Sequence, residues 1–409
     1  MCMSTSRLPV VSFVAAEFLA LLGNSALLVV FPWLVLSHTH NASLSSLITA
    51  LVMIPTAIAT FAAGRVIDGI GGKRASILAG LGCTAAAVLL CVADSIGELS
   101  VLVLIILGMG AQLFVSPSTT ARDALMDDIA TASGVAVERV AGMRQVMFSI
   151  AYAVGPALAG LLLAYRSSFI VVGIVAVMWA IAVLLTATLP GGRRQERTDP
   201  RMPRSQHSVS LIKVLRSRRS VRAAFIIGFG TSVISAPMTS VLLPAHFTAL
   251  GQPQLYGFVV SAFAIGALIG SLAYAALAKR AGAGMYLAAV VVTTVGIAGF
   301  AFLPPFWALA SALGVGGVGS GLLAPMLLVA VTRSTAQTER GRALGAYNAA
   351  ALGAGPIGLG LLGLLLHVTS GLLAGTFAVL AVWVVVAVYA LAGVKAITAP
   401  EVPQAVPGS

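Results

Sequence analysis

The stretch Gly64-Arg65-Val66-Ile67-Asp68-Gly69-Ile70-Gly71-Gly72-Lys73-Arg74 separates two long apolar segments of the chain. It combines four glycines with four charged residues. Glycine allows a sharp turn and a close approach of backbones, and charged residues mark the place where an apolar run leaves the hydrocarbon of a membrane. We therefore predict that this stretch is a loop between two membrane-spanning helices, and we expect it on the cytoplasmic side.

The composition of the whole chain supports a membrane protein. Hydrophobic residues make up 59% of the 409 residues and charged residues only 9%, with a mean hydropathy of +1.03. Soluble proteins contain roughly 25% charged residues, so this chain could not cover a water-facing surface. Three cysteines form neither a CxxC pair nor a cluster with histidine, and we expect no disulfide, metal or cofactor.

Twelve segments have the length of about 20 apolar residues that a membrane span needs. They are approximately 10–36, 44–66, 75–93, 99–121, 140–164, 168–189, 222–247, 255–278, 285–303, 306–331, 343–366 and 371–394. Their lengths favour helices over barrel strands. The first segment is too long for the core of a cleaved signal peptide, which spans about 7–15 residues, and we expect it to be retained.

The basic residues predict the orientation of the chain. If the N-terminus lies inside, all 24 Lys and Arg residues fall inside except Arg166, which lies outside, and Arg144, which lies within a span. This asymmetry predicts a plasma (inner) membrane protein with both termini in the cytoplasm. The net charge of +12 is thereby explained without nucleic acid, for which no soluble domain is expected.

The stretch 190–221 is the predicted linker, rich in Pro, Gly, Ser and Arg. It divides the chain into an N-terminal six-helix bundle, 1–189, and a C-terminal six-helix bundle with a short cytoplasmic tail, 222–409. The end of the linker, 211–222, could be a basic amphipathic helix on anionic lipid or a solvated loop.

The two predicted bundles repeat each other in sequence. Four pairs of short patterns recur in the same order with offsets between 200 and 208 positions: Gly23-Asn24-Ser25 with Gly230-Thr231-Ser232, Gly108 and Pro117 with Gly316 and Pro325, Glu138-Arg139 with Glu339-Arg340, and Gly155-Pro156 with Gly355-Pro356. Two six-span repeats around a central binding site are a transporter design. The mirrored Gly-Pro pairs favour a bend in both bundles, because proline removes a backbone hydrogen bond inside a helix.

Glu17 is the acidic residue deepest within a predicted span, about 10 Å inside at a rise of about 1.5 Å per residue. An intramembrane carboxylate is costly and therefore a candidate for function, here proton binding, with a structural salt bridge as the alternative. Arg144 lies at a similar depth in the fifth span, and we predict a Glu17–Arg144 pair that breaks on protonation. Arg144 could equally extend toward the interface and serve no coupling role.

Asn24 lies seven residues after Glu17 on the same helical face. It could line a substrate cavity or form a hydrogen bond between helices. Five further polar residues are candidates for the same cavity, with helix packing as the alternative for each: Gln112, Thr231, Ser235, Tyr347 and Asn348.

The opening stretch resembles the motif between helices 2 and 3 of the major facilitator superfamily. The matching residues are Gly64, Asp68, Gly71, Lys73 and Arg74, whereas Gly69 and Gly72 stand where the family often has arginine. The resemblance implies a cytoplasmic gate, in which Asp68 could interact with Arg122 and with the N-terminal end of the eleventh span. The alternative is that each of these charges is a solvated loop residue.

Other motifs resemble those of drug exporters in this superfamily. The pattern Ala151-Tyr-Ala-Val-Gly155-Pro156-Ala-Leu-Ala159-Gly160 is similar to their antiporter motif. Leu104 stands near Gly108 where such antiporters often carry an arginine. The segments Phe31–Leu36, Thr120–Asp123, Gly341-Arg342 and Ala354–Pro356 resemble an actinobacterial group of multidrug exporters.

The resemblance implies an all-α major facilitator fold and a monomeric, proton-coupled antiporter. Its expected partners are protons, the lipid bilayer and amphipathic drugs, with tetracycline and aminoglycosides as candidate substrates. The sequence has no Walker motif for ATP and no catalytic triad, so we expect no enzyme. Two alternatives remain open: a metabolite or siderophore carrier of the same fold, and a membrane sensor or scaffold that transports nothing.

Overall fold

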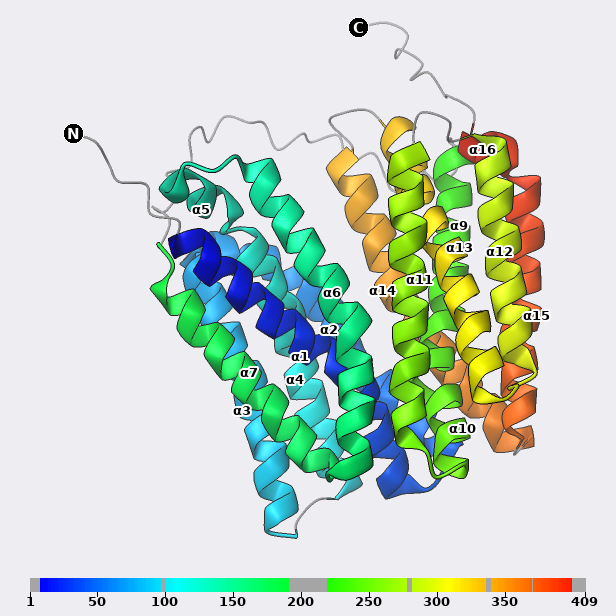
Figure 1. Cartoon of the computed structure of the whole chain (residues 1–409), viewed down its shortest axis with the longest axis horizontal. Coiled ribbons are helices and arrows are strands. Elements are labelled where there is room, and N and C mark those ends of the chain that lie inside the picture. Colours follow the sequence, from blue (N-terminus) through cyan, green and yellow to red (C-terminus); the bar gives the residue numbers. More distant parts are fainter. Residues whose placement is uncertain are drawn as a thin grey trace, which may run out of the picture. The chain divides into compact units, whose positions relative to one another are not determined.

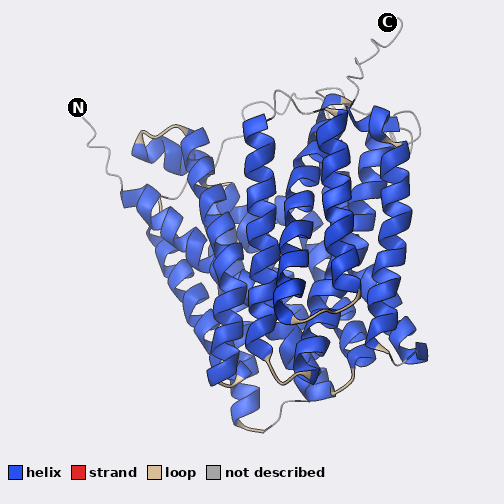
Figure 2. Ribbon diagram, turned by 45° about the vertical axis from the view of Figure 1, so that its right-hand side comes forward, coloured by secondary structure: helices blue, strands red, loops and turns tan. Residues whose placement is uncertain are grey.

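The computed structural model of the chain describes residues 8–97, 100–190, 219–277, 282–335, 340–369 and 371–398. These residues form helices and connecting turns, with no strand among them (Figure 1, Figure 2). Twelve helices in the described part are long and apolar enough to cross a membrane, by length and composition. The predicted all-α fold with twelve spans is therefore confirmed.

The helices fall into two stretches of the chain, before and after the predicted linker. Before it lie α1 (Leu8–Thr39), α2 (Ala42–Ile70), α3 (Gly72–Ser95), α4 (Val101–Asp123), α5 (Met126–Ser133), α6 (Val137–Tyr165) and α7 (Ser168–Thr188). After it lie α9 (Arg219–Pro237), the π-helix η1 (Met238–Leu242), α10 (Leu243–Ala249), α11 (Pro253–Leu277), α12 (Ala283–Ala301), α13 (Phe306–Arg333), α14 (Arg340–Thr369), α15 (Leu372–Ala392) and α16 (Val394–Thr398).

The chain divides into two compact units. The first contains the described residues within Met1–Pro200 and Leu243–Ser261, and the second contains those within Arg201–Leu242 and Ala262–Ser409. Thus α10 and the first part of α11 belong to the first unit, whereas the domain limits predicted from the sequence cut only at the linker. The predicted amphipathic helix over 211–222 lies mostly outside the described residues, and α9 begins at Arg219.

Equivalent helices pack in the same order within each unit. In the first unit α1 packs against α6 and α7, and in the second α9 packs against α14 and α15. Two buried tryptophans add to this correspondence. Trp179 of α7 donates a hydrogen bond to Asn24 Oδ1 at 3.2 Å. Trp383 of α15 donates one to Thr294 Oγ1 at 2.9 Å. This pairing agrees with the internal repeat, and the tryptophans are a matching pair that the sequence patterns had not included.

The predicted loop over Gly64–Arg74 is wrong in extent. Helix α2 continues to Ile70 and α3 begins at Gly72, so the connection consists of Gly71 alone. Gly71 has φ +85°, a conformation that L side chains rarely adopt, and its N–H closes α2 by donating to Ile67 O at 2.8 Å. The charged residues therefore lie on helical turns beyond the apolar core and do not interrupt the helices. A helix forms its own backbone hydrogen bonds in water as well as in lipid.

The predicted span 222–247 also departs from one regular helix. Helix α9 ends at Pro237 and is followed by the π-helix and then by α10, which contains Pro244. Each proline lacks the N–H that an α-helix needs for its i−4 hydrogen bond. Two prolines seven positions apart leave this segment free to take the wider π geometry.

Glycines allow α12 and α13 to pack at very short range in the second unit. A Cβ placed on Gly296 would fall on the backbone of Gly316, and one placed on Gly319 would fall on Thr293. Small residues at such positions provide the van der Waals contact on which helix association in a membrane depends. Gly284, near the start of α12, faces open space in contrast.

We therefore expect Gly296→Ala to lower the thermal unfolding temperature of the protein in detergent, measured by tryptophan fluorescence. The added methyl group must push α12 from α13, at a cost of about 1–3 kcal/mol for overpacking. Gly284→Ala is the matched control, and we expect it to leave stability unchanged or to raise it by up to about 1 kcal/mol through helix propensity. Equal effects of the two substitutions would contradict the role of Gly296 in packing.

Candidate functional site

Glu17 lies in the middle of a polar cluster inside the first unit. Its side chain is fully buried on α1, and among the described residues Glu17 and Arg122 are the charged side chains that are buried. The neighbours of Glu17 in space come from α4 and α6. A buried carboxylate needs a compensating charge or a proton, and the cluster supplies two guanidinium groups.

Arg122 forms the better aligned of the two ion pairs. Its Nε donates to Glu17 Oε2 at 2.6 Å, and its Nη1 donates to Ser118 Oγ at 2.8 Å. Ser118 lies one turn before Arg122 on α4, so the two side chains share a helical face. Charge-assisted hydrogen bonds of this kind are short and strong, and they fix the carboxylate of Glu17 against α4.

Arg144 of α6 is shared between two carboxylates. Its Nε lies 3.1 Å from Glu17 Oε1 and 2.5 Å from Asp123 Oδ1, and it is aligned as a hydrogen-bond donor to neither. The Arg144 side chain is 20% exposed and that of Asp123 is 39% exposed. The structure therefore brings together the predicted Glu17–Arg144 pair and adds Arg122 and Asp123 to it.

An apolar cluster covers the site at the end of the unit where α1 and α6 begin and α4 ends. Its members include Phe13, Leu125, Ile129, Val140 and Leu189, all buried. Phe13 and Val140 lie one turn before Glu17 and Arg144, and Leu125 follows Asp123 closely. The short helix α5, which the sequence had not predicted, supplies Ile129 to this cluster. The cluster lies next to the Glu17 site along these helices, and the Glu17 side chain is itself fully buried.

A small polar cavity lies beside the cluster, toward the middle of α1. Its volume is about 10 Å³, and its lining includes Asn24, Ser118, Arg122 and Trp179. This is near the lower limit of about 10–15 Å³ for a single water molecule. Asn24 is half-buried, and its bond from Trp179 joins α1 to α7. The interhelical hydrogen bond that was the alternative for Asn24 is therefore present, and the residue also faces the cavity.

The other predicted cavity residues are engaged mainly within their own helices or units. Thr231 donates to Ile227 O at 2.8 Å and Ser235 to Ser232 O at 3.4 Å. The ring of Tyr347 packs edge-on against that of Phe225. Gln112 is half-buried and Asn348 is exposed. The part of these five residues in a substrate cavity stays a prediction.

The residues of the predicted gate differ from one another in burial and in hydrogen bonding. Lys73 Nζ donates to Leu189 O at 2.6 Å and so caps the C-terminal end of α7, where a cation is favourable. Arg74 is exposed. The side chain of Asp68 lies outside the described residues, as does the environment of Gly64. Arg122 is buried and donates to Glu17, since α4 continues through Asp123. Its predicted interaction with Asp68 stays a prediction.

The Gly155-Pro156 pair lies at a close packing position of α6. A Cβ on Gly155 would fall on Ser25 Oγ, which donates to Ala151 O at 2.8 Å. On another face, a Cβ on Gly257 of α11 would fall on Pro156 O. Both α6 and α14 continue through their prolines, Pro156 and Pro356, and Gly355 is buried. The predicted bends stay a prediction, whereas close packing at Gly155 is observed.

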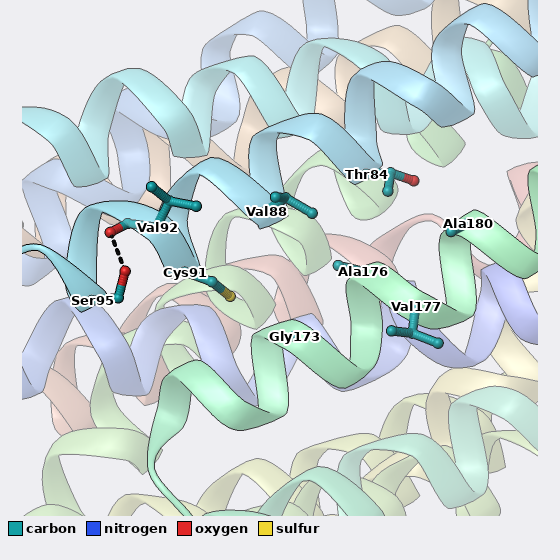
Figure 3. A pocket seen from close by; sticks show the side chains of 9 residues that line it. All are labelled: Thr84, Val88, Cys91, Val92, Ser95, Gly173, Ala176, Val177 and Ala180. Carbon is teal, nitrogen blue, oxygen red and sulfur yellow. Dashed lines mark hydrogen bonds between the residues drawn. The ribbon is translucent and has the colours of Figure 1, made fainter.

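A separate groove of about 400 Å³ runs between α3 and α7 (Figure 3). Its lining is mostly hydrocarbon, and its hydroxyl groups are used locally, since Thr84 donates to Gly80 O and Ser95 to Val92 O. Cys91 Sγ lies 3.4 Å from Phe169 O. The groove presents little that could orient a polar ligand, in contrast to the cluster around Glu17.

Comparison with known proteins agrees with this arrangement of helices. The sequence matches the model of the Major Facilitator Superfamily over residues 13–253 and 232–408. A twelve-span helical fold with a buried ion-pair cluster and this sequence match define a membrane transporter and not an enzyme. The chain belongs to the Major Facilitator Superfamily.

Its similar relatives include efflux pumps of mycobacteria. The chain is 31% identical over 359 residues to "Multidrug efflux pump Tap" of Mycobacterium tuberculosis, covering 85% of this chain and 84% of the relative. It is 28% identical over 355 residues to the protein of the same name from Mycolicibacterium fortuitum, covering 85% of this chain and 87% of the relative. The predicted resemblance to an actinobacterial exporter group is thereby confirmed.

Solved structures support the fold. The nucleoside transporter NupG has a TM-score of 0.74 at 14% identity, covering 95% of this chain and 98% of that chain. The D-xylose-proton symporter has a TM-score of 0.74 at 11% identity, covering 97% of this chain and 98% of that chain. At such low identity these likenesses describe the fold alone.

We expect Arg122→Met to destabilise the protein by about 3–5 kcal/mol, because it leaves the buried Glu17 carboxylate with Arg144 alone. Combining it with Glu17→Gln should recover most of this loss, since no buried charge is then left uncompensated. Thermal unfolding of the single and double variants in detergent tests this coupling, with the exposed Arg74→Met as control. Additive effects of the two substitutions would show that the pair is not coupled.

Proposed function

We propose that the protein is a proton-coupled antiporter that exports amphipathic drugs by alternating access. The observation that carries this proposal is the fully buried Glu17 carboxylate between two guanidinium groups. The printed names of its mycobacterial relatives supply the substrate class, multidrug efflux. Tetracycline and aminoglycosides are the first candidates within that class.

Protonation of Glu17 changes the net charge of the cluster. With both carboxylates ionised, the charges of Glu17, Asp123, Arg122 and Arg144 sum to zero. A proton on Glu17 leaves one excess positive charge and weakens the attraction that holds Arg144 to α1. Arg122 remains held by Ser118, so Arg144 is the partner that is freed to follow Asp123. In this way proton binding alters the contact between α1 and α6, which is the coupling that antiport requires.

The proton gradient then drives export, with the protein as a monomer in the plasma membrane. The apolar cluster at Phe13 and Ile129 limits proton leakage while Glu17 is ionised. The gate around Gly64, Asp68 and Gly71 stays a prediction, with Lys73 and Arg74 as further members. The bends at Gly155-Pro156 and Gly355-Pro356 likewise stay predictions of the alternating-access scheme.

The decisive experiment is drug-dependent proton release in inverted membrane vesicles, tested across a panel that includes tetracycline and an aminoglycoside. We expect Glu17→Gln to reduce proton-driven transport about a hundredfold, in the range of a lost proton-transfer group, while drug binding persists. Asp94→Asn, at an exposed carboxylate of α3, is the matched control and should transport normally. Proton-driven transport that is unchanged in Glu17→Gln would refute the coupling role.

The proposed orientation puts both termini in the cytoplasm. Fusions of a fluorescent protein and of a periplasmic phosphatase to the C-terminal end test it, because each reporter is active on one side of the membrane only. We expect fluorescence and no phosphatase activity at the C-terminus, and the opposite for fusions after Arg166. Phosphatase activity at the C-terminus would reverse the assignment.

A further inference from the structure

Asp123 is the exposed member of the cluster around Glu17. Exposure rises from Glu17, at 0%, and Arg122, at 3%, to Arg144, at 20%, and Asp123, at 39%. Glu17 is therefore closed to direct exchange with water, whereas the Asp123 side chain is partly open to it, with its Oδ1 buried beside Arg144. A buried proton-binding group needs a route by which its proton arrives and leaves.

The geometry provides such a route through a shared partner. Arg144 Nε lies 3.1 Å from Glu17 Oε1 and 2.5 Å from Asp123 Oδ1, so these two oxygens are at most 5.6 Å apart. One water molecule, with two hydrogen bonds of about 2.8 Å, can bridge oxygens separated by up to about this distance once Arg144 moves aside. The nitrogen carries a single hydrogen, so a full hydrogen bond to one carboxylate excludes an equal one to the other.

We propose that Asp123 is the port through which protons reach and leave Glu17, with Arg144 as the counter-ion shared between the two carboxylates. This inference rests on the proposed function, in which Glu17 is the proton-binding group. It adds a second carboxylate with a different task, since Asp123 exchanges protons with water and Glu17 holds them.

The transfer proceeds in two balanced steps. First, a hydrated proton binds a carboxylate oxygen of Asp123, and Arg144 then pairs with Glu17 alone. Second, the new O–H bond of Asp123 breaks while a bridging water passes a proton to Glu17 Oε1, where an O–H bond forms. Asp123 is again ionised and forms its ion pair with Arg144. The net change is one proton moved from bulk water to Glu17, and release follows the reverse order.

Four other charged or titratable side chains lie near this route. Arg122 lies beside Asp123 on α4 and holds the far oxygen of Glu17. Tyr152 of α6 lies within electrostatic range of Glu17 and Arg144. Helix α5 contributes Asp127, which is exposed, and Asp128, which is half-buried. Among the described carboxylates other than Glu17, Asp123 is the one that contacts Arg144.

The test follows protonation of Glu17 directly, with the proton itself as the probe. The full chain in liposomes is mixed rapidly with acidic buffer, and infrared spectroscopy records the band of protonated carboxyl groups. The contribution of Glu17 is the part of the band that Glu17→Gln removes. We expect Asp123→Asn to slow the growth of this part by at least about tenfold while its final amplitude is kept, because a proton-transfer group is lost and the proton site remains.

Three further variants make the result specific. Asp123→Glu should restore the rate, and Asp127→Asn, a nearby exposed carboxylate, should leave it unchanged. Asp123→Ser repeats the test with a different uncharged side chain in case Asp123→Asn does not fold. An unchanged rate in a folded Asp123 variant would overturn the port, and so would a slowing of equal size in Asp127→Asn. If Glu17→Gln removes no part of the band, the proposed proton site itself fails, which is a different result.

Discussion

A carboxylate buried between two arginines is the constraint on which the first unit of this transporter depends. A buried carboxylate needs compensating charge, and Arg122 and Arg144 supply it to Glu17. These partners fix α4 and α6 against α1, and the surrounding apolar side chains lie where they shield the pair. The second unit repeats the helix packing without an equivalent buried charge among its described residues, and its helices associate through glycines. Both units thus use close glycine packing, and the first unit adds a buried ion-pair cluster to it.

The sequence predicted most of the fold, because the bilayer imposes long apolar helices that composition alone reveals. Its errors lie at helix ends. The stretch from Gly64 to Arg74 was interpreted as a loop because of its charges, yet only Gly71 leaves helical geometry. Charge shows where a helix leaves the lipid, but not where the helix stops. The π-helix after Pro237 and the short helix α5 depend on backbone hydrogen bonding that hydropathy does not report.

The candidate site was predicted in part. The pairing of Glu17 with Arg144 followed from their similar depth, and the structure brings them within 3.1 Å. Arg122 and Asp123 were placed outside the span because the apolar run ends at residue 121. The spacing of Ser118 and Arg122 by one helical turn could have indicated that α4 continues. The rotation of a helix about its own axis, which decides that Arg122 faces Glu17, is not readable from one sequence.

The connection of α2 to α3 through Gly71 has a mechanical consequence. A connection of one residue keeps the end of α2 next to the start of α3. Gly72 packs against Ala121 O of α4, and Lys73 binds the end of α7. A displacement of this end of α2 therefore also bears on α3, α4 and α7. The short connection and these contacts therefore favour movement of α2, α3, α4 and α7 as one body.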